Sequence, residues 1–286
     1  MYVWIDALCN YLTAVGYPDK NSSNYIKYWP AIHIVGKDIL RFHSIYWPAF
    51  LMASNIEPPK RVFAHGWWTN EGEKISKSVG NVIDPLQLVK TYGLDPVRYF
   101  LLREVPFGND GDFSHEAMMH RMNSDLANDL GNLCQRVLSM VNKNCNAKVP
   151  VHGEFNTADT NLMEKAKKLL EPLRTAMDEQ AFHIALNAIW EVIGDANRYV
   201  DAQAPWALRK TDPERMVTVL YALVETIRRL TIFVQPFMPD ACAKILDQLS
   251  VPEDARSFNS LETVLAAGQA LPKPLPVFPR FVAEEE

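Results

Sequence analysis

The stretch A-I-H-I-V, at Ala31–Val35, is a short run of apolar and β-branched residues, which is typical of a buried strand. A second such run, R-V-F-A-H-G, lies at Arg61–Gly66. The segment between them has a helical pattern that begins after Asp38, which can cap it, and continues to about Ser54, with Pro48 kinking or ending it. A strand, a helix and a strand in this order predict a parallel βαβ unit with a right-handed crossover.

Two loops follow these predicted strands, Gly36-Lys37-Asp38 and His65-Gly66-Trp67. Ligands of parallel sheets bind outside the carboxyl ends of the strands, so we expect both loops to line one crevice. At the start of the chain, Y-V-W-I at Tyr2–Ile5 has the pattern of the end of a strand. Nothing precedes it to begin a domain, so we expect the chain to be part of a longer one.

Beyond Asp84 the pattern changes to helices. One begins near Pro85 and stops at Gly93, and D-P-V-R-Y-F-L-L-R forms the next. Amphipathic segments follow at 115–145, 159–178, 180–201 and 212–248, with a loop at 146–158 and a proline-rich, extended tail. The predicted fold class is α/β plus all-α: a partial Rossmann-like domain over 1–112, then an antiparallel α-helix bundle over 113–286.

Composition limits the classes of protein to consider. The 286 residues, 48% of them hydrophobic, suffice for two cores. Residues 1–112 carry 11 Lys+Arg and 11 Asp+Glu, and residues 113–286 carry 18 and 23, so a nucleic-acid partner would need a local basic patch. The four cysteines are scattered, which disfavours a zinc site and fits a cytoplasmic location. Apolar stretches are too short to predict a transmembrane helix or a membrane partner.

A compact basic motif, Lys74-Ile75-Ser76-Lys77-Ser78, lies between Gly72 and Gly80. Two ammonium groups beside an α/β crevice suit a polyphosphate and can stabilise a departing pyrophosphate. The flanking glycines would let the loop close and reopen, and the serines can donate hydrogen bonds. The alternative is a solvated turn, which is the better interpretation of such a short motif taken alone.

An apolar, aromatic-walled pocket is a further candidate. Its residues have near-helical spacing on the first stretch and a spacing of four on the second: Trp4, Ala7, Leu8 and Tyr11, then Ile39, His43 and Trp47. Such a pocket suits a thioether, because sulfur meets ring edges favourably, and Tyr11 and His43 could each offer the sulfur a polar contact. The alternative is ordinary core, with His43 a satisfied core histidine.

These segments, taken in order, resemble the methionyl-tRNA synthetases, which are class I aminoacyl-tRNA synthetases. K-I-S-K-S is similar to their K-M-S-K-S loop, with Ile75 in place of Met. The resemblance covers nearly the whole chain and includes Y-V-W-I-D-A-L-C-N-Y at Tyr2–Tyr11, H-I-V-G-K-D-I-L-R-F-H-S-I-Y-W at His33–Trp47, H-G-W-W-T-N-E-G at His65–Gly72, G-N-L-C-Q-R at Gly131–Arg136 and A-P-W at Ala204–Trp206.

The resemblance implies a two-step reaction. Methionine attacks the α-phosphate of ATP, which binds with Mg²⁺, and the resulting methionyl-adenylate acylates methionine tRNA. Lys74, Ser76 and Lys77 would be catalytic, with Lys77 the most important. The resemblance also implies that Gly36 and Asp38 meet the ATP ribose and that His65, Gly66 and Trp68 line the adenine side. It makes the aromatic pocket the methionine site.

In the predicted bundle, Asn132 and Arg136 are four residues apart, and Trp206 follows Pro205. An aromatic ring can stack on an unstacked base, while Asn and Arg read base edges. The resemblance implies that these residues recognise the CAU anticodon. The alternatives are that Arg136 pairs with a nearby acid and that Trp206 fills a helix junction, and the acidic charge of this half supports them.

The H-I-G-H signature of class I synthetases is absent from the sequence, since H-I-V-G at His33–Gly36 is one residue off and lies on the later strand. We therefore expect a carboxyl-side portion that needs the amino-terminal half as its partner, with no zinc or other metal site of its own. The leading hypothesis is a methionine–tRNA ligase, inactive as this chain alone. The alternatives are a non-catalytic tRNA-binding module, or a class I synthetase for valine, isoleucine, leucine or cysteine.

Overall fold

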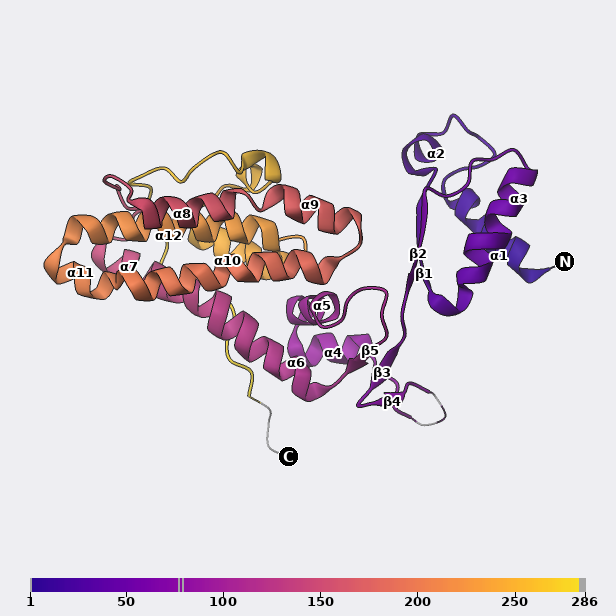
Figure 1. Cartoon of the computed structure of the whole chain (residues 1–286), viewed down its shortest axis with the longest axis horizontal. Helices are drawn as coiled ribbons and strands as arrows, with labels where there is room; N and C mark the ends of the chain where they lie inside the picture. The colour runs from indigo at the N-terminus through magenta and orange to yellow at the C-terminus, as the bar shows by residue number, and fades with distance from the viewer. Residues whose placement is uncertain (1, 77, 79, 283–286) are drawn as a thin grey trace. The chain divides into compact units, whose positions relative to one another are not determined.

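The computed structural model describes residues 2–76, 78 and 80–282. The chain divides into two compact units (Figure 1). The first comprises the residues up to Lys74 together with Phe107–Asp112, and the second comprises the remainder. Residues 75–106, which the sequence analysis placed in the first domain, thus group by packing with the bundle. This division shows which residues pack together most densely. The boundary at 112 between the Rossmann-like domain and the bundle stays a prediction.

The first unit contains the predicted βαβ arrangement. Strands β1 (Ile32–Gly36) and β2 (Arg61–His65) pair in parallel, with Ile32 opposite Arg61 and Gly36 opposite His65. The connection between them contains a 3-10 turn over Lys37–Ile39, a π-helical turn over Phe42–Tyr46 and helix α3 (Trp47–Ala53). Because the strands are parallel and in register, Gly36 and His65 end at the same edge of the sheet, as predicted.

The predicted cap of the connecting helix by Asp38 is wrong, and the helical path does not end at Pro48. Asp38 lies inside the 3-10 turn, and the start of this fully described turn, at Gly36, has no side-chain cap. Pro48 is the second residue of α3 and the chain is helical on both sides of it. The helical path is irregular directly before Pro48, where the backbone forms the π-helical turn, because a proline inside a helical path lacks the N–H that would continue the hydrogen-bond ladder.

The stretch Tyr2–Ile5 belongs to a helix, so the prediction of a strand end was wrong. Helix α1 (Val3–Ala14) buries Leu8 and Leu12 against α3, in a small core completed by Trp29, Trp47, Leu51 and Ile56. Four apolar residues are too few to distinguish the periods of strand and helix, and the longer spacing of apolar residues through Leu12 is helical. Helix α2 (Ser23–Tyr28) follows, capped by the hydroxyl of Ser22.

A small sheet that the sequence analysis did not predict follows β2. Its order is β4-β3-β5, with β3 (Trp68–Asn70) and β4 (Glu73–Lys74) forming an antiparallel hairpin and β5 being Gly111–Phe113. The hairpin turn includes Gly72, whose φ of +80° favours glycine. Strands of two or three residues are too short to show a period-two pattern, so sequence alone could not reveal them.

The second unit is helical, as predicted. Helices α4 (Pro85–Tyr92) and α5 (Leu94–Arg103) precede a nearly continuous helix made of α6 (His115–Arg121), a π-helical stretch over Met122–Gly131 and α7 (Asn132–Asn144). The bundle continues with α8 (Thr157–Lys167), α9 (Leu170–Asp178), α10 (Phe182–Gln203), α11 (Pro205–Thr211), α12 (Pro213–Val234) and α13 (Pro239–Gln248). The tail beyond Leu261 contains no regular helix or strand through Val282.

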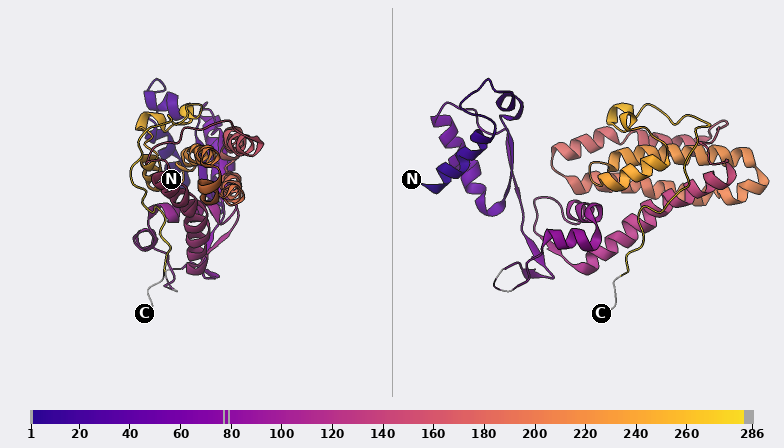
Figure 2. Two further views of the ribbon diagram at one scale, coloured as in Figure 1. Left: turned by 90° about the vertical axis from the view of Figure 1, so that its left-hand side faces the viewer. Right: turned by 180° about the vertical axis from the view of Figure 1, so that it is seen from behind.

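Helix α12 is the centre of this bundle. Figures 1 and 2 show it beside α8 and α10, and the structure buries it over almost its whole length. Its buried carboxylate Glu225 pairs with both Arg228 and Arg229, so these charges are compensated within one helix. The predicted segments 159–178 and 212–248 are each interrupted. The second is interrupted near Pro236 and Pro239, because proline cannot continue a helix from its interior.

Two negative findings apply to the described part of the chain. None of its helices combines the length and the apolar character needed to cross a bilayer. Its four cysteines are all free, and Cys134 and Cys242 are buried in the bundle.

Candidate functional site

The first unit brings most of the predicted pocket residues together. The Tyr11 hydroxyl lies 2.9 Å from Nε2 of His43, and Nδ1 of His43 lies 3.0 Å from the carbonyl oxygen of Ile39. A carbonyl only accepts, so Nδ1 carries the hydrogen and Nε2 accepts the Tyr11 hydroxyl. His43 thus has both nitrogens engaged, and it cannot donate to a sulfur atom while these bonds last.

Burial separates the pocket residues into two groups. Leu8, His43 and Trp47 are each only 1% exposed, and Leu8 and Trp47 pack in the small core of this unit. Trp4, Tyr11 and Ile39 are partly exposed and Ala7 is exposed, so they can border a ligand.

Two aromatic residues in this cluster were missed. Phe42 stacks on Trp4, with ring centroids 4.0 Å apart and an interplanar angle of 7°. His33 is buried and accepts a hydrogen bond of 3.1 Å from Nε1 of Trp47. Burial, helped by the neighbouring His43, lowers the pKa of His33 to about 4, so its ring is neutral near pH 7. The inward position of His33 in its strand was the available signal.

The predicted nucleotide residues lie together at the ends of β1 and β2. A Cβ placed on Gly36 would lie 2.5 Å from a carboxylate oxygen of Asp38 and 3.9 Å from Cε1 of His65. Nδ1 of His65 donates to the carbonyl of Gly66 at 2.9 Å, which directs its ring. A carboxylate, a glycine and an imidazole edge therefore converge, and Trp68 is partly buried on the adjacent β3.

Gly66 has a packing role that the sequence did not reveal. It is buried, and a Cβ there would lie 2.2 Å from the backbone oxygen of Asn109 and 2.5 Å from the backbone nitrogen of Asp110. The segment Phe107–Asp112 thus crosses directly over this glycine. The absence of a side chain at Gly66 allows this close approach.

Lys37, Trp67 and Asp110 form an ion-pair cluster at the same edge. Nζ of Lys37 donates to both carboxylate oxygens of Asp110 at 2.6 Å, and the backbone N–H of Trp67 donates to the same carboxylate at 2.9 Å. These hydrogen bonds hold the pKa of Asp110 below its usual range. The Lys37 ammonium also lies 4.4 Å from the Trp67 ring centroid. Asp110 was missed because it is 73 residues from Lys37.

The basic motif is described except for Lys77, which lies outside the described residues. Lys74 is exposed at the end of β4, with its Nζ 5.7 Å from the Trp67 ring centroid. The backbone N–H of Ser76 donates to the side chain of Asn81 at 2.9 Å, and the hydroxyls of Ser76 and Ser78 are 2.7 Å apart. The two serines therefore bond locally, which fits a formed turn.

In the second unit, the predicted anticodon residues surround the end of α10. Arg136 donates to Asp201 at 2.7 Å and to Asn197 at 3.3 Å, so it does pair with a nearby acid. Trp206 is 51% exposed and does not fill the helix junction, where Pro205 is buried instead. Asn132 is exposed one turn before Arg136 on α7. An exposed indole suits stacking on a base, and an amide and a guanidinium suit contacts with base edges.

Comparison with known families covers nearly the whole chain. Residues 1–138 match the family model described as tRNA synthetases class I (M), and residues 149–286 match the anticodon binding domain of methionyl tRNA ligase. The first match, together with the parallel strands and the basic motif, defines the class as a class I tRNA synthetase. Within that class, the chain belongs to the methionine–tRNA ligase family. Both matches go against a synthetase for another amino acid.

Individual relatives agree. The methionine–tRNA ligases of Brucella suis biovar 1 (strain 1330) and Mycobacterium leprae (strain TN) are 60% and 54% identical to the whole of this chain, which covers 56% and 54% of their lengths. The structure of Mycobacterium tuberculosis methionyl-tRNA synthetase in complex with methionyl-adenylate is 54% identical, with a TM-score of 0.95 over 98% of this chain and 56% of that one. The chain thus spans a little over half the length of these relatives.

In the described ranges, no group of three or more His, Cys, Asp or Glu side chains is arranged to hold a metal ion.

Proposed function

We propose that this chain supplies methionine contacts, nucleotide contacts and the anticodon-binding bundle of a methionine–tRNA ligase. The enzyme would activate methionine with ATP and transfer it to methionine tRNA. The observation that carries this proposal is the aromatic cluster around the Tyr11–His43 hydrogen bond, because it joins residues from α1 and from the β1–α3 connection. The solved structure of the Mycobacterium tuberculosis relative contains methionyl-adenylate, which supports the same assignment.

The pocket chemistry suits a thioether. Trp4 and Phe42 offer stacked apolar faces, and Tyr11 offers a ring whose hydroxyl is held by His43. A polarizable sulfur gains from contacts with the edges of aromatic rings. The neutral state of His33, behind Tyr11, keeps the base of the pocket uncharged near pH 7.

The nucleotide would bind at the strand ends. The Asp38 carboxylate can accept hydrogen bonds from ribose hydroxyls, and the lack of a side chain at Gly36 lets this carboxylate lie against the end of β1. The ring of His65 and the partly buried Trp68 would face the adenine. Lys74, Ser76 and Lys77 would act on the phosphates, with Mg²⁺ entering on the polyphosphate as part of the substrate.

The bundle would bind the anticodon. Trp206 can stack on one base, and Asn132 can contact a base edge. Arg136 is already held by Asp201, so its guanidinium is oriented before tRNA arrives. Preorganised contacts of this kind reduce the entropy lost on binding.

The test is ATP–pyrophosphate exchange, run on this chain and on the chain extended at its amino end to the length of its relatives. We expect that only the extended chain catalyses methionine-dependent exchange. We expect both chains to bind methionine tRNA. Parallel reactions with leucine, isoleucine and valine are the controls. Exchange that is faster with one of these would refute the methionine assignment. Tight tRNA binding with no exchange by the extended chain would instead identify a non-catalytic tRNA-binding module.

A further inference from the structure

Helix α11 is a short connection that presents Trp206. Ala204 precedes it and ends α10 in the left-handed region, with a φ of +43°. Asp212 follows it and caps α12, because its side chain accepts a hydrogen bond of 3.0 Å from the N–H of Arg215. Pro205 is buried, but Trp206 projects from the first turn with half of its surface exposed. The direction of this indole therefore depends on how firmly both ends of α11 are held.

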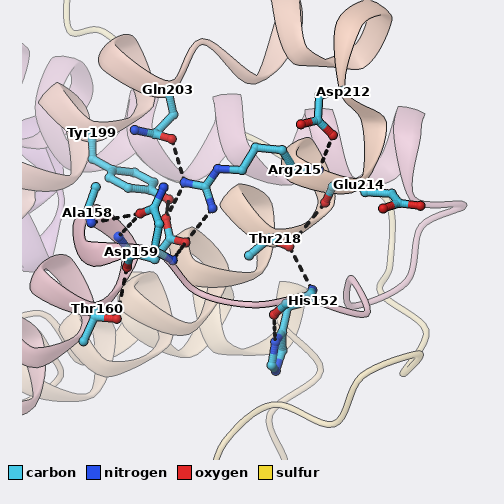
Figure 3. A network of polar contacts seen from close by, with 12 residues as sticks. His152, Ala158, Asp159, Thr160, Tyr199, Gln203, Asp212, Glu214, Arg215 and Thr218 are labelled. Atoms are coloured by element: carbon cyan, nitrogen blue, oxygen red, sulfur yellow. Dashed lines mark hydrogen bonds and ion pairs between the residues drawn. The ribbon is translucent and has the colours of Figure 1, made fainter.

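A buried carboxylate lies beneath this connection (Figure 3). Asp159 of α8 is fully buried and accepts from Nη1 and Nη2 of Arg215 at 2.5 and 2.6 Å, from the hydroxyl of Tyr199 and from the N–H of Asn156 at 2.9 Å. Burial alone would raise its pKa, but the bonds from Arg215 and Tyr199 outweigh that effect and lower it. Asp159 is thus a charged, fully bonded anchor for α10 and α12.

One further bond closes the connection. Nη2 of Arg215 also donates to Oε1 of Gln203 at 2.6 Å. Gln203 is the last residue of α10 and Arg215 lies in the first turn of α12, so this bond joins the residues on either side of α11. It draws both ends of the connection onto the Asp159 anchor.

We propose that Gln203 and Arg215 are positioning residues for tRNA recognition, because their hydrogen bond sets the direction in which α11 holds Trp206. The inference rests on the proposed role of Trp206 in stacking on a base of methionine tRNA. An indole on a short helix next to a left-handed residue would otherwise sample several directions. Restricting it before binding reduces the ordering that tRNA has to impose.

Gln203 is the residue at which positioning can be separated from folding. Removing Arg215 would leave the Asp159 carboxylate buried and unpaired, which is strongly destabilising. Gln203→Ala leaves the ion pair and the Tyr199 bond in place and removes only the tie to the end of α10. It also leaves the net charge unchanged, so long-range attraction of tRNA is unaffected.

The experiment measures the dissociation constant for methionine tRNA of the 286-residue chain and of Gln203→Ala, Trp206→Ala and the double variant. The matched control is Gln235→Ala. Gln235 ties the other end of α12 to the carbonyl of Arg256 at 3.2 Å, and about 30 Å of helix separates it from Arg215. Thermal melts of all variants report folding.

We expect Gln203→Ala to weaken tRNA binding about five- to tenfold, which is the lower end of the roughly 5- to 150-fold loss that one aromatic–base stack represents. It should add no further loss to Trp206→Ala, because it acts through that residue. Gln235→Ala should leave tRNA binding unchanged. In the amino-extended enzyme, exchange of ATP and pyrophosphate without tRNA should be unchanged by Gln203→Ala.

The outcomes that overturn the inference are distinct from those that overturn the proposed function. Wild-type affinity in a folded Gln203→Ala variant, with Trp206→Ala weakened, would reject positioning and leave the stacking role intact. Equal losses from Gln203→Ala with and without Trp206 would also reject it, because Gln203 would then act independently. Wild-type affinity in a folded Trp206→Ala variant would reject the stacking role itself, and the inference with it.

Discussion

Gly66→Ala is the substitution that most directly tests the architecture of the nucleotide edge. The new Cβ would lie 2.2 Å from the backbone oxygen of Asn109, and real Cβ contacts are essentially never below 3.0 Å. The segment must therefore retreat by about 0.8 Å, since its backbone atoms have no rotamer by which to move aside. Asp110 follows Asn109 directly, so the shift also pulls on its bonds to Lys37 and Trp67.

The expected cost has two parts. Overpacking of this kind typically destabilises a protein by about 1–3 kcal/mol. The displaced Asp110 would in addition lose its bonds to Lys37 and Trp67, which hold in place the loops at the strand ends where we propose that ATP binds. In the amino-extended enzyme we expect a lower melting temperature and a higher KM for ATP in pyrophosphate exchange, with a smaller change in the KM for methionine.

Two other glycines provide matched controls. A Cβ on Gly72 would meet no atom within 4 Å, but the φ of +80° at this position is strained for alanine. Gly72→Ala therefore tests backbone strain without a clash, with an expected loss of stability of about 1 kcal/mol. A Cβ on Gly36 would meet the side chain of Asp38, which can rotate away, so Gly36→Ala should raise the KM for ATP with little loss of stability. If Gly66→Ala matched the wild type in both melting temperature and KM for ATP, the segment over Gly66 would be no wall of the site.

Three further predictions concern the first unit. Lys74→Met in the amino-extended enzyme should lower the rate of adenylate formation far more than the affinity for methionine, because the lysine charge would act on the departing pyrophosphate. Pre-steady-state kinetics of adenylate formation measure both quantities. A loss confined to methionine affinity would contradict this role. His43→Leu removes the acceptor that holds the Tyr11 hydroxyl, and we expect the enzyme to reject norleucine less strongly. An unchanged ratio of kcat/KM for methionine and norleucine would identify His43 as a core residue. Stability should fall as the pH drops from about 6.5 to about 4, by up to about 3 kcal/mol, because in this window the unfolded chain takes up a proton that folded His33 excludes. Denaturant unfolding of His33→Gln should show a shallower pH dependence, and an identical pH profile would contradict the assignment.

The local pattern of apolar and polar residues was enough to predict much of the fold. Apolar periodicity reports how a residue meets its near neighbours along one element, so it located the paired strands and the long helices of the bundle. The same signal failed where an element was too short to show a period, as in β3, β4 and β5, or where only part of a helix was considered, as at Tyr2–Ile5.

The candidate site divides in the same way. The residue types and spacing of the sequence indicated which side chains suit a thioether, a nucleotide or a base, and the resemblance of ordered motifs indicated the family. They gave no sign that both ring nitrogens of His43 are engaged by Tyr11 and Ile39.

What the sequence determined by itself was the order and kind of the elements, because these depend on interactions between residues that are close along the chain. Only the tertiary structure decided which distant groups meet. Asp110 joins Lys37 across 73 residues, and Asp159 joins Arg215 across 56. No periodicity records such pairs, since a carboxylate can satisfy its hydrogen-bonding needs with any donor that packing brings near. Packing alone decided that a backbone segment crosses Gly66 and that Arg215 bonds both Asp159 and Gln203.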